Sequence, residues 1–135
     1  MDEEKKKILI VEDDVFVRDI YNLKFNSEGF EVILAMDGRE ALARLTEAVP
    51  DIILLDIIMP YMDGMEVLDH FTENRPDTTV VVLTGYGTIE TAVQAVKRGA
   101  FDYLTKPAKL DEILLILKRA EELKELKAEN VLLRS

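Results

Sequence analysis

The stretch ILIVEDD, residues 8–14, places four branched aliphatic residues directly before three acidic ones. A similar arrangement returns in IILLD, residues 52–56, and in VVVLT, residues 80–84, which ends on a threonine. A fourth short run, FDYLT at residues 101–105, leads into a Lys-Pro pair. Short runs rich in Val, Ile and Leu are typical of buried parallel strands. The sequence therefore predicts a parallel sheet whose strands end in polar groups along one edge, where open α/β sheets bind ligands.

Composition limits the class of protein. The chain has 135 residues, which suits one domain with an extension, and its formal net charge is −10. The excess acid lies before residue 109, because the chain from Lys109 onward carries 6 basic and 6 acidic side chains. Such a chain is not expected to bind nucleic acid directly. It has no cysteine, no apolar run of about 18 residues and no signal peptide, so we expect a cytoplasmic protein.

Strands and helices are expected to alternate along the chain. Gly29 and Gly99 follow two of the expected helices, and Pro50 ends another. The expected strands are 6–12, 30–34, 51–55, 79–83 and 101–104, and the expected helices are 15–28, 39–49, 65–72, 89–98 and a long one from residue 110. This alternation predicts a doubly wound α/β fold with a five-stranded parallel sheet in the flavodoxin-like order 2-1-3-4-5 and five helices. We expect one domain over residues 1–120 and a linker helix over 121–135.

Asp13, Asp14 and Asp56 follow the first and third expected strands, on the two sides of the switch point of that strand order. Carboxylates gathered there repel one another, and Mg²⁺ would offset the repulsion because it prefers oxygen ligands. An ionised Asp56 could then attack phosphorus and form an acyl phosphate. Lys106 is the expected second cation, and the Thr84 hydroxyl is expected to bind a phosphoryl oxygen.

These residues also have ordinary structural interpretations. Asp13 or Asp14 could simply cap a helix, and Thr84 could be structural at a strand end. Lys106 could be a solvated lysine, and Tyr103 could be an aromatic residue at the rim of the sheet. The combination is more informative than any member, because four separate segments deliver complementary groups to one sheet edge. For Mg²⁺ binding, we expect the Asp14 side chain to matter more than that of Asp13.

Three motifs make the chain resemble the receiver domains of two-component response regulators. They are ILIVEDD, PDIILLDIIMPYMDGMEVL and VVVLTGYGTIETAVQAVKRGAFDYLTKP, and the similarity extends over residues 6–120. The resemblance implies phosphorylation by a sensor histidine kinase, with Mg²⁺ as the cofactor. It implies these roles: phosphoryl acceptor for Asp56, acidic metal pair for Asp13 and Asp14, backbone-carbonyl metal ligand for Ile58, switch hydroxyl for Thr84, switch aromatic for Tyr103 and phosphate-pairing lysine for Lys106.

Three further expectations follow from the same resemblance. The Lys106-Pro107 bond is typically cis in that family. The positions of Ile58 and Tyr86 flank the path by which water reaches the phosphorus in receivers. Both side chains are bulky, and neither is a carboxylate or an amide that would orient water. We therefore expect a long-lived phosphoryl group.

The segment TGYGTIETAVQAVKRGAFDYLTKP and the ending RAEELKELKAENVLLRS most resemble receivers of NtrC-type, sigma-54-dependent transcriptional activators. That resemblance implies a receiver and linker that precede an ATPase module, and a readout surface made by the fourth helix, fifth strand and fifth helix. The residues Leu123, Leu126, Asn130 and Leu133 alternate at spacings of three and four, as coiled-coil a and d positions do. We expect a homodimer through the fourth and fifth helices and the linker helix, which would form a parallel coiled coil, and we expect no membrane contact. A single helix that frays past Leu126 is the alternative to the coiled coil.

Other functions fit the sequence less well. A phosphatase of the haloacid dehalogenase type needs a second Asp two positions beyond the nucleophile, where this chain has Ile58. A flavodoxin needs a hydroxyl- and glycine-rich loop after its first strand, where this chain has Glu12-Asp13-Asp14. A stand-alone phospho-receiver that acts by docking to other proteins remains open. We expect a regulatory phosphoacceptor domain that catalyses only its own phosphorylation and dephosphorylation.

Overall fold

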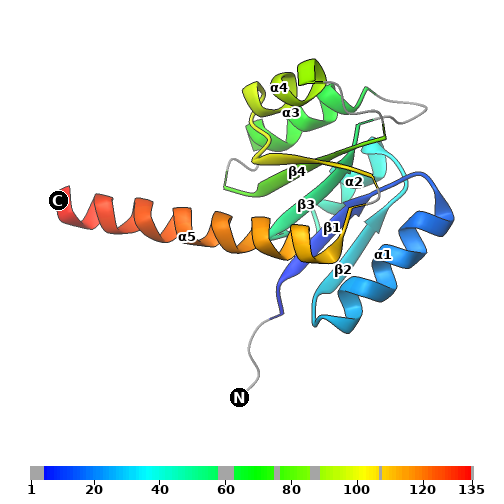
Figure 1. Ribbon diagram of the computed structural model, residues 1–135, viewed down its shortest axis with the longest axis horizontal. Coiled ribbons are helices and arrows are strands. Elements are labelled where there is room, and N and C mark those ends of the chain that lie inside the picture. The colour runs from blue at the N-terminus through cyan, green and yellow to red at the C-terminus, as the bar shows by residue number, and fades with distance from the viewer. Residues whose placement is uncertain (1–4, 58–62, 75–76, 86–88, 107, 135) are drawn as a thin grey trace.

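The computed structural model describes residues 5–57, 63–74, 77–85, 89–106 and 108–134 of the chain. Five parallel strands form a sheet in the order β2-β1-β3-β4-β5 (Figure 1). The strands are β1 (Lys7–Val11), β2 (Glu31–Ala35), β3 (Ile52–Asp56), β4 (Thr79–Thr84) and β5 (Asp102–Thr105). This order confirms the predicted fold. It also places β1 beside β3, at the point where the strand order reverses and open α/β sheets form their ligand sites.

The central strands β1, β3 and β4 are covered on both faces. Every residue of β3 and β4 is buried, and so is β1 beyond Lys7. Strands buried on both faces need continuous apolar sequence, which explains the unbroken aliphatic runs that predicted them. β1 pairs with β3 in a constant register, from Ile8 opposite Ile52 to Val11 opposite Leu55. One step further along this register, residue 12 is level with residue 56.

Five helices connect or follow the strands, and their ends carry the expected signals. They are α1 (Val15–Ser27), α2 (Gly38–Arg44), α3 (Gly64–Asn74), α4 (Ile89–Lys97) and α5 (Leu110–Arg134). Asp14 and Asp37 are the N-caps of α1 and α2. Gly29 and Gly99 follow α1 and α4 with φ angles of 88° and 111°. Glycine is favoured at both positions because a side chain would strain that backbone conformation.

Helix α2 is shorter than the expected helix over residues 39–49. The Thr46 N–H donates to the Ala43 carbonyl at 3.2 Å, and the Glu47 N–H donates to the Arg44 carbonyl at 3.0 Å. The Thr46 hydroxyl donates to the same Ala43 oxygen at 2.7 Å. These bonds reach back three residues instead of four, so they tighten the last turn and end the helix. The helix therefore ends before Pro50, and Pro50 lies in the segment that leads into β3.

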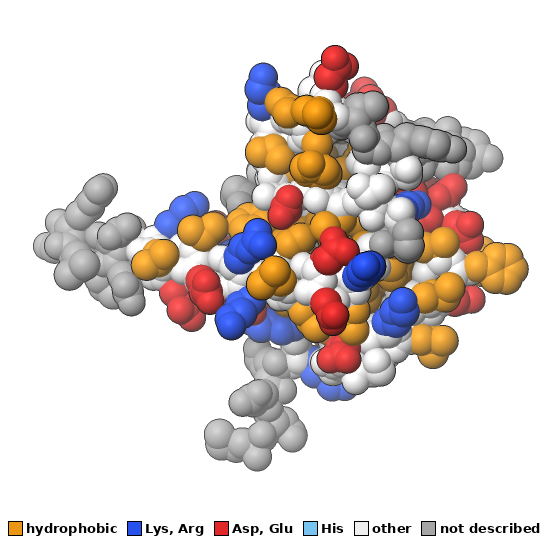
Figure 2. All heavy atoms as spheres, in the orientation of Figure 1, with side chains coloured by type: hydrophobic (Ala, Val, Ile, Leu, Met, Phe, Trp, Pro, Cys, Tyr) orange, Lys and Arg blue, Asp and Glu red, His pale blue; other side chains and the backbone are white. Residues whose placement is uncertain are grey.

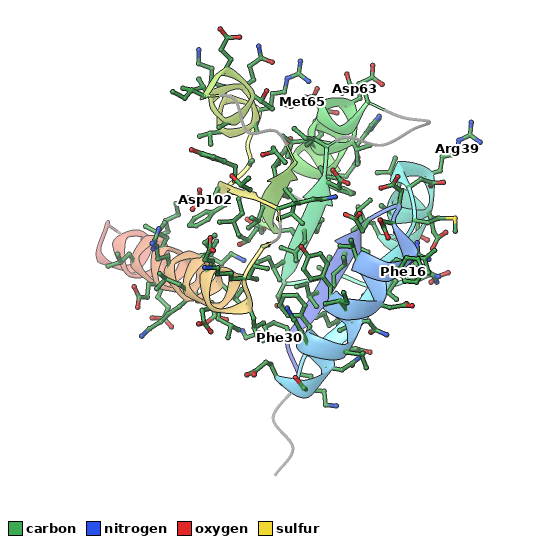
Figure 3. All side chains as sticks on the ribbon, turned by 45° about the vertical axis from the view of Figure 1, so that its right-hand side comes forward. Phe16, Phe30, Arg39, Asp63, Met65 and Asp102 are labelled. Atoms are coloured by element: carbon green, nitrogen blue, oxygen red, sulfur yellow. The ribbon has the colours of Figure 1, made fainter. Side chains whose placement is uncertain are left out.

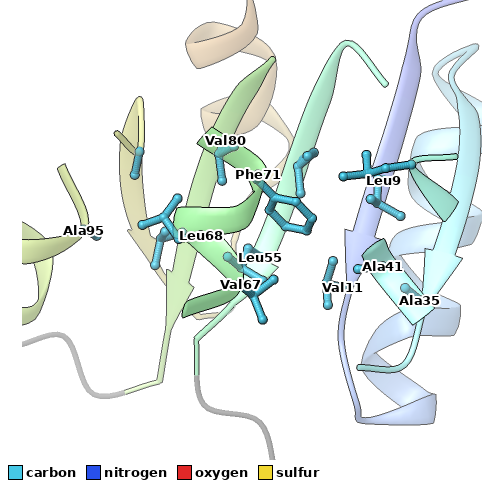
Figure 4. Packing of buried hydrophobic residues seen from close by; sticks show 14 residues of the cluster. Leu9, Val11, Ala35, Ala41, Leu55, Val67, Leu68, Phe71, Val80 and Ala95 are labelled. Atoms are coloured by element: carbon cyan, nitrogen blue, oxygen red, sulfur yellow. The ribbon is translucent and has the colours of Figure 1, made fainter. Parts of the chain in front are cut away.

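Two apolar layers cover the faces of the sheet. One layer lies against α2, α3 and α4, and the Phe71 side chain of α3 is fully buried within it (Figure 4). The other layer lies against α1 and α5 and contains Phe25 and Phe30. The rings of these two residues meet edge to face with centroids 5.5 Å apart. Burial of aromatic side chains on both faces fixes the helices relative to the sheet.

Helix α5 has a packed part and a projecting part. Its packed part contributes Ile113, Ile116, Leu117 and Ala120 to the buried core. Beyond these residues the helix extends away from the sheet (Figure 1). An ion pair of 2.8 Å between Lys6 Nζ and the Glu121 carboxylate joins the helix to the start of β1 near this point. Because both partners are substantially exposed, this pair contributes little stability, and the apolar contacts hold the packed part.

Gly64 allows the start of α3 to approach the chain that leaves β3. A Cβ at this position would lie 2.5 Å from the Ile57 carbonyl oxygen and closer still to the Ile57 Cα. The same turn is capped by Asp63, whose carboxylate accepts a hydrogen bond from the Met65 N–H at 2.9 Å (Figure 3). The close approach therefore helps to fix the backbone that follows Asp56.

We predict that Gly64→Ala lowers the free energy of unfolding by about 2 kcal/mol or more, because backbone atoms at the end of a central strand cannot move aside easily. Urea denaturation measures the change. Gly85→Ala is the matched control, since a Cβ at Gly85 meets no described atom within 4 Å. The control should change the unfolding free energy by less than about 0.5 kcal/mol. Equal losses in the two variants would contradict the steric explanation.

Candidate functional site

The carboxyl ends of four strands bring polar groups together at one edge of the sheet. Glu12 follows β1, Asp56 ends β3, Thr84 ends β4, and Lys106 follows β5. Glu12, Asp56 and Thr84 are buried. The Glu12 N–H donates to the Ala35 carbonyl at 3.0 Å, and the Lys106 N–H donates to the Thr84 carbonyl at 2.8 Å. Backbone hydrogen bonds thus hold the ends of neighbouring strands in place around the site.

The Lys106 ammonium lies between two buried carboxylates. Its Nζ atom is 2.6 Å from Asp56 Oδ2 and 2.8 Å from Glu12 Oε2. It also donates to Glu12 Oε1 at 3.1 Å. Buried carboxylates are unfavourable unless they are paired with a cation or hydrogen-bond donors. The lysine supplies one positive charge for two negative ones, so the described groups leave a net negative charge in the site.

The environment shifts the proton affinities of this cluster. Burial raises the pKa of Glu12 above its ordinary value; the hydrogen bond from Lys106 opposes this shift, and the Asp56 carboxylate adds to it. Burial alone would lower the pKa of Lys106, but its hydrogen bonds to Asp56 and Glu12 outweigh burial and raise that pKa overall. The lysine is therefore a permanent cation at neutral pH, placed directly against Asp56.

Three carboxylates could hold a metal ion. Glu12, Asp13 and Asp56 each offer an oxygen, and these atoms lie within 4.8 Å of one another. Asp13 is exposed and the other two are buried. A set of carboxylate oxygens that is open to solvent on one side suits Mg²⁺, which binds few carboxylates and keeps several waters. A divalent cation also fits the charge, because Lys106 offsets only one of the three carboxylates.

Asp14 lies in a different position from these carboxylates. Its Oδ1 atom accepts hydrogen bonds from the N–H groups of Phe16 at 2.9 Å and Val17 at 3.3 Å, so it caps α1. It is not part of the described cluster of possible metal ligands. The geometry therefore favours Asp13 over Asp14 as the metal ligand, the reverse of the order expected from the sequence.

Glu12 is a site residue that the sequence interpretation did not assign to the site. The signal that could have identified it is the register of two strands. Ile8 and Ile10 lie opposite Ile52 and Leu54. Since side chains alternate along a strand, the next residue on the same face of β1 is Glu12, and its counterpart on β3 is Asp56.

Thr84 and Tyr103 occupy different surroundings. The Thr84 hydroxyl oxygen is buried and has no hydrogen-bond partner among the described residues, which is unfavourable for a polar atom. Tyr103 is 41% exposed and lies outside the carboxylate cluster. It borders an open groove whose other lining residues are Ile89, Ala92, Val93, Val96 and Lys97 of α4. Figure 2 shows apolar side chains gathered over this helix.

Three sequence-based expectations fall outside the described residues. Ile58, Tyr86 and Pro107 are not among them. The carbonyl ligand from Ile58, the bulky side chains of Ile58 and Tyr86 beside the phosphate, and the Lys106-Pro107 bond therefore stay predictions.

Residues 8–118 match the response regulator receiver domain family. The chain belongs to this family. Curated relatives include the regulatory protein AtoC of Escherichia coli, which is 43% identical over 91% of this chain and 27% of its own length. The transcriptional regulatory protein ZraR of Klebsiella oxytoca is 39% identical over 89% of this chain and 27% of its own length. The receiver thus spans about a quarter of these relatives, and its similarity to receivers of NtrC-type sigma-54-dependent activators is confirmed.

Solved structures agree in fold. NtrX from Brucella abortus has a TM-score of 0.84 and 38% identity, with coverage of 96% of this chain and 30% of that chain. A CheY-like receiver domain protein from Methanospirillum hungatei has a TM-score of 0.82 and 32% identity, with coverage of 88% of this chain and 98% of that chain. Receiver domains are regulatory domains of two-component signalling, and this receiver shares their fold. None of its described helices is long and apolar enough to cross a membrane.

We predict that Asp13→Asn weakens Mg²⁺ binding by roughly tenfold or more, because it removes a charged ligand from the carboxylate cluster. Asp14→Asn should change the affinity by less than about threefold, because asparagine caps a helix as well as aspartate does. Calorimetric titration with Mg²⁺ measures both affinities. A larger loss in the Asp14 variant would restore the order expected from the sequence and exclude the assignment made from the geometry.

Proposed function

We propose that this receiver accepts a phosphoryl group on Asp56 from a sensor histidine kinase, with Mg²⁺, and changes conformation in response. The observation that carries the proposal is the contact of 2.6 Å between Lys106 Nζ and Asp56 Oδ2 beside an acidic cluster. A cation that is already fixed beside a buried carboxylate can neutralise part of the negative charge that a phosphoryl group adds there. The proposal places the domain in the cytoplasm, where the kinase's phosphorylated histidine would meet it.

In the transfer, an Asp56 carboxylate oxygen forms a bond to phosphorus. The bond between phosphorus and the donor's nitrogen breaks, and its electron pair leaves with the nitrogen. Lys106 is placed to neutralise the oxygen charge that accumulates on the transferring group. Mg²⁺, held by Asp13, Asp56 and Glu12, would supply additional positive charge. The domain would catalyse only its own phosphorylation and dephosphorylation, and no other substrate is proposed.

Thr84 and Tyr103 are the proposed switch residues. The buried Thr84 hydroxyl lacks a described partner, so a hydrogen bond to a phosphoryl oxygen would satisfy it. Movement of Thr84 at the end of β4 would open space toward β5, into which the Tyr103 ring could turn from its exposed position. The groove between Tyr103 and α4 would then change shape. This is a shift between two conformations that is biased by the charge of the phosphoryl group.

We propose that the switch controls dimerisation of a transcriptional activator through α4, β5 and α5. Support comes from the exposed apolar groups on the projecting part of α5, where Leu123 and Leu126 are 47% and 55% exposed. The remaining expected seam residues, Asn130 and Leu133, have side chains outside the described part of the helix. Two copies that pair along this face would bury these leucines, and this chain would contact neither nucleic acid nor membrane.

Asp56→Asn should abolish phosphorylation, because an amide is a poor nucleophile toward phosphorus. After incubation with acetyl phosphate and Mg²⁺, intact mass should show one phosphoryl adduct on the unsubstituted protein and none on the variant. Asp37→Asn is the matched control: Asp37 is the N-cap of α2 and lies outside the described carboxylate cluster, and asparagine preserves its capping role. A phosphoryl adduct on the Asp56 variant would show that Asp56 is not the acceptor.

Leu126→Lys should weaken self-association at least roughly tenfold, because it places a charge in the proposed apolar seam. Sedimentation equilibrium measures the dimer constant with and without beryllofluoride, which mimics the phosphoryl group. Ala128→Lys is the control, since residue 128 falls outside the a and d positions of the same helix. If every sample is monomeric at high concentration, the coiled-coil proposal is wrong and the alternative of a single helix holds.

A further inference from the structure

The Tyr21 side chain connects α1 to the loop that carries the site lysine. Tyr21 is 3% exposed and lies in the apolar layer under α1. Its hydroxyl oxygen accepts a hydrogen bond from the Ala108 N–H at 3.3 Å, within the buried interior. Ala108 is two residues beyond Lys106 and is itself buried. A phenylalanine would fill the same apolar volume, so the hydroxyl needs an explanation beyond packing.

The loop that carries Lys106 is held on both sides of the lysine. Before it, β5 pairs with β4 up to Thr105 opposite Thr84. At the lysine itself, the N–H donates to the Thr84 carbonyl at 2.8 Å. After it, the Ala108 N–H donates to Tyr21. The reach of the ammonium to Asp56 depends on where this backbone lies, because the lysine side chain starts from it.

The Tyr21 ring is a firm support for such a contact. It packs against Phe25 with ring centroids 6.3 Å apart, and Phe25 packs in turn against Phe30. All three rings are buried in the layer between the sheet and the helices on that face. Aromatic rings in a close-packed interior lose most of their freedom to move. The hydroxyl is therefore held at a fixed place relative to the sheet.

The hydroxyl also lies within electrostatic reach of the site. Burial is the main reason that the pKa of Tyr21 is raised; the hydrogen bond with Ala108 opposes the shift, and the charge of Glu12 adds to it. The phenol is thus neutral under ordinary conditions. It supports the lysine loop without placing a further charge next to the carboxylates.

We propose that Tyr21 is a positioning residue that sets the Lys106 ammonium against Asp56 by holding the Ala108 amide. The inference rests on the proposed phosphoryl transfer to Asp56 and identifies a residue from α1 that governs its rate. Tyr21 acts through the lysine and does not touch the reacting atoms. Tyr21 contributes no ligand to the proposed Mg²⁺ site, whose carboxylates come from the ends of β1 and β3, so its loss should change Mg²⁺ binding far less than the phosphorylation rate.

The test compares phosphorylation rates of Tyr21→Phe and the unsubstituted protein with acetyl phosphate at saturating Mg²⁺. We expect labelling to be roughly three- to tenfold slower in Tyr21→Phe, because a small displacement of a catalytic group lowers rates strongly. The Mg²⁺ dissociation constant should change by less than about twofold. Phe71→Leu, in the apolar layer on the opposite face of the sheet, is the control for a general loss of stability and should label at the normal rate. Equal rates for Tyr21→Phe and the unsubstituted protein would overturn the inference.

A double-mutant cycle separates positioning from packing. In a Lys106→Met background, Tyr21→Phe should have no further effect on the rate, because the hydroxyl acts through the lysine. A full additional loss in that background would show that Tyr21 acts independently of Lys106 and would refute the proposal.

NMR provides a readout that needs no phosphorylation. In Tyr21→Phe, the Ala108 amide should exchange with solvent at least roughly tenfold faster, and the Lys106 Cε resonance should shift. If the unsubstituted protein takes up no phosphoryl group, the proposed function fails, and the Lys106 resonance still decides whether Tyr21 positions the lysine. An unchanged Lys106 resonance would overturn that role.

Discussion

The constraint on which this site depends is the placement of two carboxylates side by side in the interior. The parallel register of β1 and β3 puts Glu12 level with Asp56, and both are buried. Their mutual repulsion at low effective dielectric would be severe without a cation. Lys106, which arrives from the far end of the sheet after β5, donates to both carboxylates. The position of the Lys106 ammonium beside these two carboxylates therefore depends on the order of the strands, on the length of β5 and on the course of the loop after it.

The carboxylates also determine which ligands this edge of the sheet can bind. A site with two buried carboxylates, one exposed carboxylate and a single lysine keeps a net negative charge. It therefore favours a hard divalent cation, and with that cation in place it would attract a phosphoryl group that the bare carboxylates would repel. Metal and phosphoryl group thus depend on each other in the proposed reaction. The Thr84 hydroxyl, which has no partner among the residues that the structure describes, could donate a hydrogen bond to the phosphoryl group.

The sequence predicted those parts of the fold and site that depend on local pattern. The aliphatic runs identified β1, β3 and β4, and Asp56 and Lys106 were recognisable because each follows a short strand-like run. The sequence interpretation assigned the metal pair to Asp13 and Asp14 and left Glu12 out, because three consecutive acidic residues look alike until strand register and helix capping distinguish them. Register directs Glu12 to Asp56, and capping occupies Asp14. The contact between Tyr21 and Ala108 had no sequence signal, because it joins residues that only the packing of α1 brings together.

The projecting part of α5 has a mechanical consequence. The helix continues to Arg134 from Ala120, the last buried residue among those whose side chains the structure describes. At a rise of about 1.5 Å per residue this segment is about 21 Å long, and an α-helix of that length behaves as a stiff rod. A tilt of about 10° at the packed end would move the far end by about 4 Å. The helix thus acts as a lever. A rearrangement at its packed end that is too small to disturb the apolar core would produce a larger displacement at its far end, enough to change which surfaces of two copies contact each other.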